Sequence, residues 1–111
     1  MIKILIIISS RFPNYDLENT IEKIYKHQNF KKYHIDICII DSDSSTFYTY
    51  KNLKNKYQNI FIELSRNCNY EYGAYKKGHE LYPDYDVYFC VQDTVYITKE
   101  IDFSVFTDST K

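Results

Sequence analysis

An uninterrupted apolar run near the start of the chain, residues 4–8, constrains the fold more than any other feature, and four of its five residues are isoleucine. A short apolar run without polar alternation is typical of a strand that is covered on both faces. Strands of that kind occur mainly in parallel sheets with helices on both sides. The run is too short to span a bilayer, and the segment lacks the cleavage site of a signal peptide. It therefore points to an α/β fold.

Three further apolar segments follow, separated by segments of helical periodicity. We expect strands at residues 2–8, 35–40, 60–64 and 86–91, and helices at residues 16–28, 47–57 and 72–82. Parallel strands need crossover connections, so this alternation predicts a Rossmann-like parallel β-sheet of about four strands, wound right-handed, with helices on both faces. It also predicts one α/β domain over residues 1–97 and a C-terminal tail over residues 98–111.

Composition excludes several classes of protein. The 111 residues suffice for one domain, and 44% of them are apolar and 26% charged, which favours an ordinary soluble domain. A formal net charge of −1 provides no basic surface for nucleic acid or for an acidic membrane. We therefore expect a cytoplasmic protein with no transmembrane segment and no nucleic-acid partner.

The three cysteines are Cys38, Cys68 and Cys90, an odd number without CxxC spacing. Two of them, Cys38 and Cys90, lie inside apolar segments. This usage predicts free, buried thiols in a reducing compartment.

Small residues are rare in this chain. Both glycines and the single alanine, Gly73, Ala74 and Gly78, lie within six residues of one another. Ala74 and Gly78 are four residues apart and share one face of the expected helix. Either this helix packs closely on the sheet or its backbone approaches a ligand, and both interpretations stay open.

Polar residues follow each expected strand. They are Ser9-Ser10-Arg11, Asp41-Ser42-Asp43, Ser65-Arg66-Asn67 and Gln92-Asp93-Thr94. The carboxyl ends of parallel strands meet at one edge of a sheet, where open α/β sheets bind ligands. Arg11 and Arg66 are the only arginines in the chain, and a planar guanidinium suits phosphate. The pattern predicts a ligand site at this edge; the alternative is that these residues form ordinary polar loops.

Several kinds of site are excluded or disfavoured. The chain has no GxGxxG after its first strand and no GxxxxGK[ST] segment, which argues against a dinucleotide-binding domain and a P-loop NTPase. His27, His34 and His79 lie away from the expected ligand edge. We therefore expect the histidines on the surface or in packing contacts, and not as catalytic bases.

Three segments resemble the nucleotide-binding half of inverting GT-A-type glycosyltransferases, the large family that includes bacterial polysaccharide and spore-coat transferases. IIISSRFPNY is an apolar strand with a Ser-rich end followed by a helix of matching length, and IDSDSS is similar to the family's VDDGS element. The stretch SRNCNYEYGAYKKGHELYPDYDVYFCVQDT is similar to the family's Asn and small residues at the start of a helix, followed by a D-Y turn, an apolar strand and the DxD region. The resemblance covers residues 3–94.

This resemblance implies a nucleotide-diphosphate sugar, UDP-linked, as the ligand and Mn²⁺ or Mg²⁺ as the cofactor. The implied nucleotide-sugar-binding residues are Ser9, Ser10, Arg11, Asp41, Asp43, Arg66, Asn67, Gly73 and Ala74, and the implied metal ligand is Asp93. Asp41 would contact the base, and Ser9 to Arg11 would line the pocket for the base and ribose. A divalent cation at Asp93 would neutralise the diphosphate and stabilise it as a leaving group.

The chain departs from the family pattern in two ways. Gln92-Asp93-Thr94 offers one carboxylate where the family has two or three. The family's acceptor site and catalytic base lie in a second half that this sequence lacks, so residues 98–111 are either a tail or the start of that missing half. The expected partners are therefore a nucleotide-sugar donor and either a second copy of the chain or a missing acceptor-binding segment, and the catalytic residues stay open.

Two other functions remain compatible with the pattern. The first is a non-catalytic binding or assembly module of the same fold, which the single carboxylate and the missing acceptor half favour. The second is an unrelated phosphate-binding α/β protein such as a small hydrolase. In that case Ser9 or Ser10 would be the nucleophile without a nearby histidine.

Overall fold

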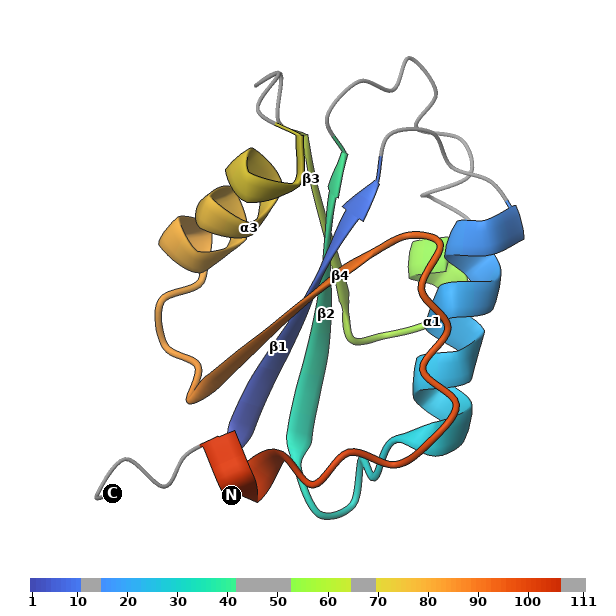
Figure 1. Ribbon diagram of the computed structural model, residues 1–111, viewed down its shortest axis with the longest axis vertical. Coiled ribbons are helices and arrows are strands. Elements are labelled where there is room, and N and C mark those ends of the chain that lie inside the picture. Colours follow the sequence, from blue (N-terminus) through green and yellow to red (C-terminus); the bar gives the residue numbers. More distant parts are fainter. Residues whose placement is uncertain (11–14, 42–52, 65–69, 107–111) are drawn as a thin grey trace.

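The computed structural model describes residues 1–10, 15–41, 53–64 and 70–106. Four parallel strands form one sheet: β1 (Lys3–Ser10), β2 (His34–Asp41), β3 (Ile60–Leu64) and β4 (Val87–Gln92). Their order across the sheet is β3-β2-β1-β4 (Figure 1). This is the order of the first four strands of a Rossmann fold, so the predicted α/β class is confirmed.

Two longer helices cover opposite faces of the sheet: α1 (Tyr15–His27) on one side and α3 (Tyr70–Leu81) on the other (Figure 1). Residues 53–56 are also helical, and a short 3₁₀ helix, η1 (Phe103–Phe106), lies near the end of the described chain. The predicted bounds of α1, α3 and the strands agree with the structure to within two residues. Residues 47–52 of the predicted middle helix lie outside the described residues. No helix in the described ranges is long and apolar enough to cross a membrane.

The α1 face of the sheet carries the larger apolar core. Alternate side chains of β1 and β2 point to this face, where they pack with α1 and with Leu53. Phe103 of η1 is fully buried in the same core, with its ring edge-on to Tyr33 at 5.4 Å and to Phe89 at 5.9 Å between centroids. The limits predicted for the domain, 1–97 and 98–111, stay a prediction; the structure adds that Phe103 belongs to the core.

The α3 face carries a smaller apolar cluster formed by Leu5, Ile7, Cys38, Ile40 and Ala74. At Gly78 an added Cβ would lie 2.8 Å from Cδ1 of Ile7 and 3.1 Å from its Cγ1. A side chain at this position would therefore collide with β1. The glycine allows close packing of α3 on the sheet, which settles the question of why Gly78 is small.

The cysteines differ from one another in exposure. Cys38 is free and buried as predicted, and burial raises the pKa of its thiol to about 12. Cys90 is free but exposed, so the prediction that it is buried was wrong. The physical reason is that β4 is an edge strand and α3 lies mainly over β1 and β2. Cys68 lies outside the described residues.

Candidate functional site

The carboxyl ends of the parallel strands meet at the upper edge of the sheet in Figure 1. Strand register places Ser10 of β1 beside Asp41 of β2, and Ser9 of β1 beside Gln92 of β4. Strand order proceeds from β1 through β2 to β3 and then returns to the other side of β1 at β4. The β1–β4 boundary is therefore the topological switch point, the place where open α/β sheets bind ligands.

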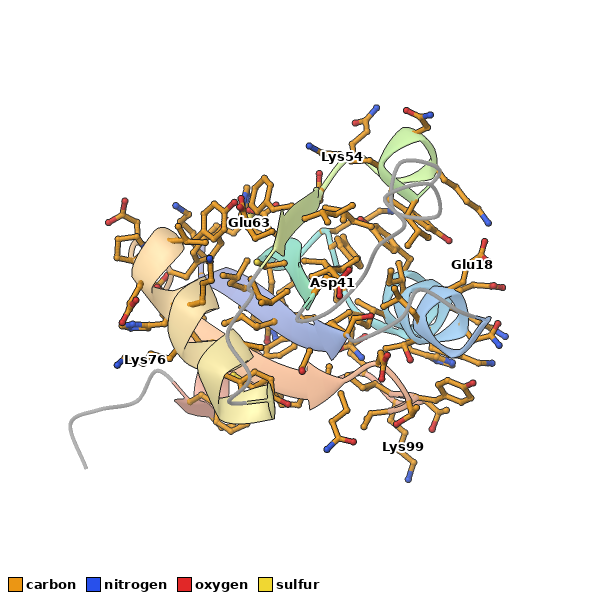
Figure 2. The ribbon with its side chains drawn as sticks, turned by 90° about the horizontal axis from the view of Figure 1, so that it is seen from above. Glu18, Asp41, Lys54, Glu63, Lys76 and Lys99 are labelled. Carbon is orange, nitrogen blue, oxygen red and sulfur yellow. The ribbon has the colours of Figure 1, made fainter. Side chains whose placement is uncertain are left out.

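Among the described acidic residues at this edge, Asp41 is the most enclosed. Its residue is 1% exposed, and its register partners are Ser10 on one side and Leu64 on the other. Figure 2 looks down on the edge and shows Asp41 near the middle of the molecule, with Glu18 at the periphery. The buried Oδ2 atom accepts no hydrogen bond from the described residues, although the residue has other interactions. A carboxylate in such surroundings interacts strongly with a donor group that reaches it, because solvent screening is weak.

Asp93 follows β4 directly and lies in a tight turn. Its amide donates a hydrogen bond of 3.1 Å to the carbonyl oxygen of Ser9, and its own carbonyl oxygen accepts one of 2.7 Å from Oγ1 of Thr20. The amide of Val95 closes the turn by donating to the carbonyl oxygen of Gln92 at 3.2 Å. The backbone around Asp93 is thus bonded both to β1 and to α1, while its side chain is partly exposed.

The structure brings only some of the predicted site residues together. Ser9, Ser10, Asp41 and Asp93 lie at the carboxyl ends of β1, β2 and β4. Gly73 and Ala74 lie in the first half of α3, and both are buried. Arg11, Asp43, Arg66 and Asn67 lie outside the described residues.

Ala74 has a packing role that explains its burial. It is 2% exposed and belongs to the cluster with Leu5 and Ile7 on the α3 face. Its small side chain is therefore accounted for by contact between α3 and the sheet. A contact of Gly73 or Ala74 with a nucleotide stays a prediction.

Thr20 is a residue of this edge that sequence reasoning missed. It lies on the buried face of α1 with Leu17, Ile21 and Ile24, and it is fully buried itself. The signal in the sequence was a hydroxyl on an otherwise apolar helix face. Its partner, Asp93, lies 73 positions further along the chain, so no local pattern links the two.

Asp93 is a described carboxylate at this edge that can contribute to a divalent cation site. No group of three or more His, Cys, Asp or Glu side chains that could hold a metal occurs in the described part of the chain. Mg²⁺ in nucleotide sites commonly takes one or two carboxylates and completes its shell with phosphate oxygens and water. Asp93 can provide such a carboxylate, so the residues present fit a cation that is shared with a phosphate ligand.

Two of the three histidines, His34 and His79, have neighbours among the described residues. Nε2 of His34 lies 2.8 Å from Oδ2 of Asp36, near the start of β2 and away from the carboxyl edge. The ring of His79 packs against Tyr88 at 4.5 Å between centroids. These contacts fit the surface and packing roles predicted for His34 and His79.

Comparisons of the chain with protein-family models, with curated proteins and with solved structures found no match. Function is therefore inferred from the fold and from the residues at the carboxyl edge of the sheet.

Proposed function

We propose that the chain is a glycosyltransferase-like domain that binds a nucleotide-diphosphate sugar, UDP-linked, at the carboxyl edge between β1 and β4. The observation that carries the proposal is that Ser10, Asp41 and Asp93 lie at the carboxyl ends of β1, β2 and β4, so that the two acidic residues flank the end of the central strand β1 beside the switch point. Two of these residues, Ser10 and Asp41, are almost fully buried, which is unusual for polar groups in ordinary surface loops.

Asp41 is proposed to recognise the base. Uracil carries an imide N–H, and a carboxylate accepts such a bond more strongly than a neutral oxygen does. Burial of Asp41 favours this contact because little water competes for the carboxylate. Ser9 and Ser10, at the end of the neighbouring strand, would provide hydroxyl groups beside the base and ribose.

Asp93 is proposed to lie beside the diphosphate and to hold Mn²⁺ or Mg²⁺ with it. When bound, the cation would supply charge neutralisation of the departing diphosphate. The role of Asp93 itself is to orient one carboxylate oxygen toward the phosphates from a turn that is bonded on both sides. Transfer of the sugar would further need an acceptor-binding segment with a general base, so the proposal for this chain is donor binding.

Thermal unfolding with UDP, UDP-glucose or GDP-mannose, each with and without Mn²⁺, tests the proposal. A ligand at about 100 times its dissociation constant stabilises the native state by about 2.7 kcal/mol, which raises the unfolding midpoint by several degrees. We expect the largest rise with UDP-glucose and Mn²⁺. Asp93→Asn should remove the Mn²⁺-dependent part of the rise in the unfolding midpoint. Asp41→Asn should weaken the binding of both uridine ligands.

Asp84→Asn is the matched control, because Asp84 is exposed and precedes β4 at the opposite edge of the sheet. It should leave every shift unchanged. Absence of a shift with all three nucleotides would contradict the proposal. That outcome would favour the non-catalytic binding or assembly module of the same fold, for which the single carboxylate of Gln92-Asp93-Thr94 is the supporting observation.

A further inference from the structure

We propose that Thr20 is a positioning residue that orients Asp93 for the cation and diphosphate. The inference rests on the proposed function of the β1–β4 edge and extends it to a side chain on α1. Thr20 is not expected to touch the ligand. It acts through the backbone of the turn that follows β4.

The backbone around Asp93 is held on both sides of its Cα atom. The amide that donates to Ser9 belongs to the peptide unit before Asp93, and the carbonyl that accepts from Thr20 belongs to the peptide unit after it. A residue has only two soft backbone dihedrals, one toward each of these peptide planes. Bonding both planes therefore sets φ and ψ of Asp93 and with them the direction of its Cα–Cβ bond.

Thr20 provides this bond from an unusual place. It is fully buried on the α1 face, where its neighbours on the helix are Leu17, Ile21 and Ile24. A buried hydroxyl costs free energy unless it is hydrogen-bonded, and in helices threonine commonly bonds a carbonyl of its own preceding turn. Here the hydroxyl donates to Asp93, 73 residues away, at 2.7 Å. Valine has nearly the same shape and would fill an apolar face without that cost.

When the backbone of Asp93 is fixed, only its side-chain torsions remain to be ordered when a cation binds. Preorganisation of this kind lowers the entropy lost on binding, and residues that support a metal ligand typically change metal affinity by about 10- to 100-fold when they are removed. Loss of the Thr20 hydroxyl should therefore weaken the Mn²⁺-dependent part of donor binding. Nucleotide binding without metal should change little.

The experiment compares Thr20→Val, which removes the hydroxyl, with Thr20→Ser, which keeps it. Dissociation constants for UDP-glucose are measured by calorimetry with and without Mn²⁺, on protein whose folding is checked by circular dichroism. We expect Thr20→Val to weaken binding in Mn²⁺ by about tenfold. It should leave the dissociation constant without metal within about twofold of the wild-type value. Thr20→Ser should behave like the wild type. If Thr20→Val does not fold, Thr20→Ala against Thr20→Ser isolates the hydroxyl, since both lack the methyl group.

The outcomes separate this inference from the proposed function. If Thr20→Val binds UDP-glucose in Mn²⁺ as tightly as the wild type does, the positioning role is overturned and the proposed function is not. Equal losses in Thr20→Ser, which keeps the hydroxyl, and in Thr20→Val, which lacks it, also overturn it, because the loss would then not follow the hydroxyl. Absence of Mn²⁺-dependent binding in the wild type overturns the proposed function, and the positioning role with it.

Discussion

The two faces of the sheet are closed by different means. On the α1 face the core is wide, and the segment after β4 covers it by burying Phe103. Two polar side chains, Thr20 in α1 and Gln28 directly after it, bond that segment: Thr20 donates to the carbonyl of Asp93, and Gln28 bonds the carbonyl of Lys99 and the amide of Ile101 at 2.8 and 2.9 Å. This face is held together by apolar burial and by bonds from side chains to backbone.

The α3 face has a smaller apolar cluster, and tyrosines surround it. Tyr85 donates a hydrogen bond to Asp36, and Tyr82 donates one of 2.7 Å to Glu63. The ring of Tyr82 also stacks on Phe61 at 4.9 Å between centroids. Aromatic rings thus extend the apolar surface while their hydroxyls satisfy carboxylates next to the sheet. The comparison teaches that one face depends mainly on burial and the other on hydrogen-bonded rings and close backbone approach.

Removal of the Phe103 ring should cause the largest effect. Phe103→Ala opens a cavity in the α1-face core and should lower the free energy of unfolding by about 3–5 kcal/mol. The midpoint of thermal unfolding should fall by roughly 10 °C or more. Phe106→Ala is the control, because Phe106 lies in the same 3₁₀ helix but is 57% exposed. Equal effects of the two variants would show that the segment after β4 does not close this core.

Removal of one tyrosine hydroxyl should have a smaller effect that distinguishes the faces. Tyr85→Phe leaves Asp36, which is 7% exposed, without one of its donors, and should cost about 2 kcal/mol in urea unfolding. Tyr33→Phe on the α1 face removes a bond to Asp102, which is exposed and keeps its bonds from Ser104. We expect less than about 1 kcal/mol there. A larger loss of stability in Tyr33→Phe than in Tyr85→Phe would contradict the difference described between the two faces.

A methyl group at Gly78 tests the close approach of α3 to β1. Overpacking against Ile7 lowers the free energy of unfolding by about 1–3 kcal/mol, and the higher helix propensity of alanine offsets up to about 1 kcal/mol of this loss. Gly78→Ala should therefore destabilise the fold by about 1 kcal/mol net. Ile7→Val removes the Cδ1 atom in contact, so the double variant should cost less than the two single costs added together. A stabilised Gly78→Ala protein would contradict the packing described for this face.

Alkaline pH should weaken the α3 face gradually. Burial, followed by the hydrogen bond to Asp36, raises the pKa of Tyr85 above its usual value of 10.0, and burial and the bond to Glu63 do the same for the pKa of Tyr82. The unfolded chain then loses these protons at a lower pH than the native state does. Stability is therefore complete below pH 10 and declines as the pH rises above it.

Urea unfolding at pH 7 and at pH 10.5 measures this decline. The double variant Tyr82→Phe, Tyr85→Phe should show a smaller loss between the two pH values than the wild type. Tyr25→Phe is the comparison on the α1 face, where burial raises the pKa of Tyr25 to about 12. If the double variant loses as much stability as the wild type, these two tyrosines do not cause the alkaline sensitivity.

Much of the fold could be predicted because its signals are local. Apolar runs such as residues 4–8 and the spacing of Leu17, Ile21 and Ile24 specify a strand and a helix within a few residues. The polar ends of the strands also follow from the sequence, and the parallel arrangement places Ser10 and Asp41 side by side. The candidate site was predictable to that extent.

The exposure of Cys90 could not be predicted, since its segment is as apolar as that of Cys38. Whether a strand is central or lies at an edge depends on strand order, and strand order depends on where each crossover packs. The sequence pattern of β4 does not indicate whether this strand is central or at an edge. The edge position of β4 emerges only in the assembled sheet.

The amino-acid sequence by itself determined the alternation of strands and helices, the parallel sheet and the polar character of its carboxyl edge, because hydrophobic periodicity and turn residues act over short distances. The tertiary structure alone decided that Phe103 enters the core and that Thr20 bonds the backbone of Asp93. Both contacts join segments far apart in the chain. They form only after helices and strands have packed, when a buried ring must fill space and a buried hydroxyl must find an acceptor.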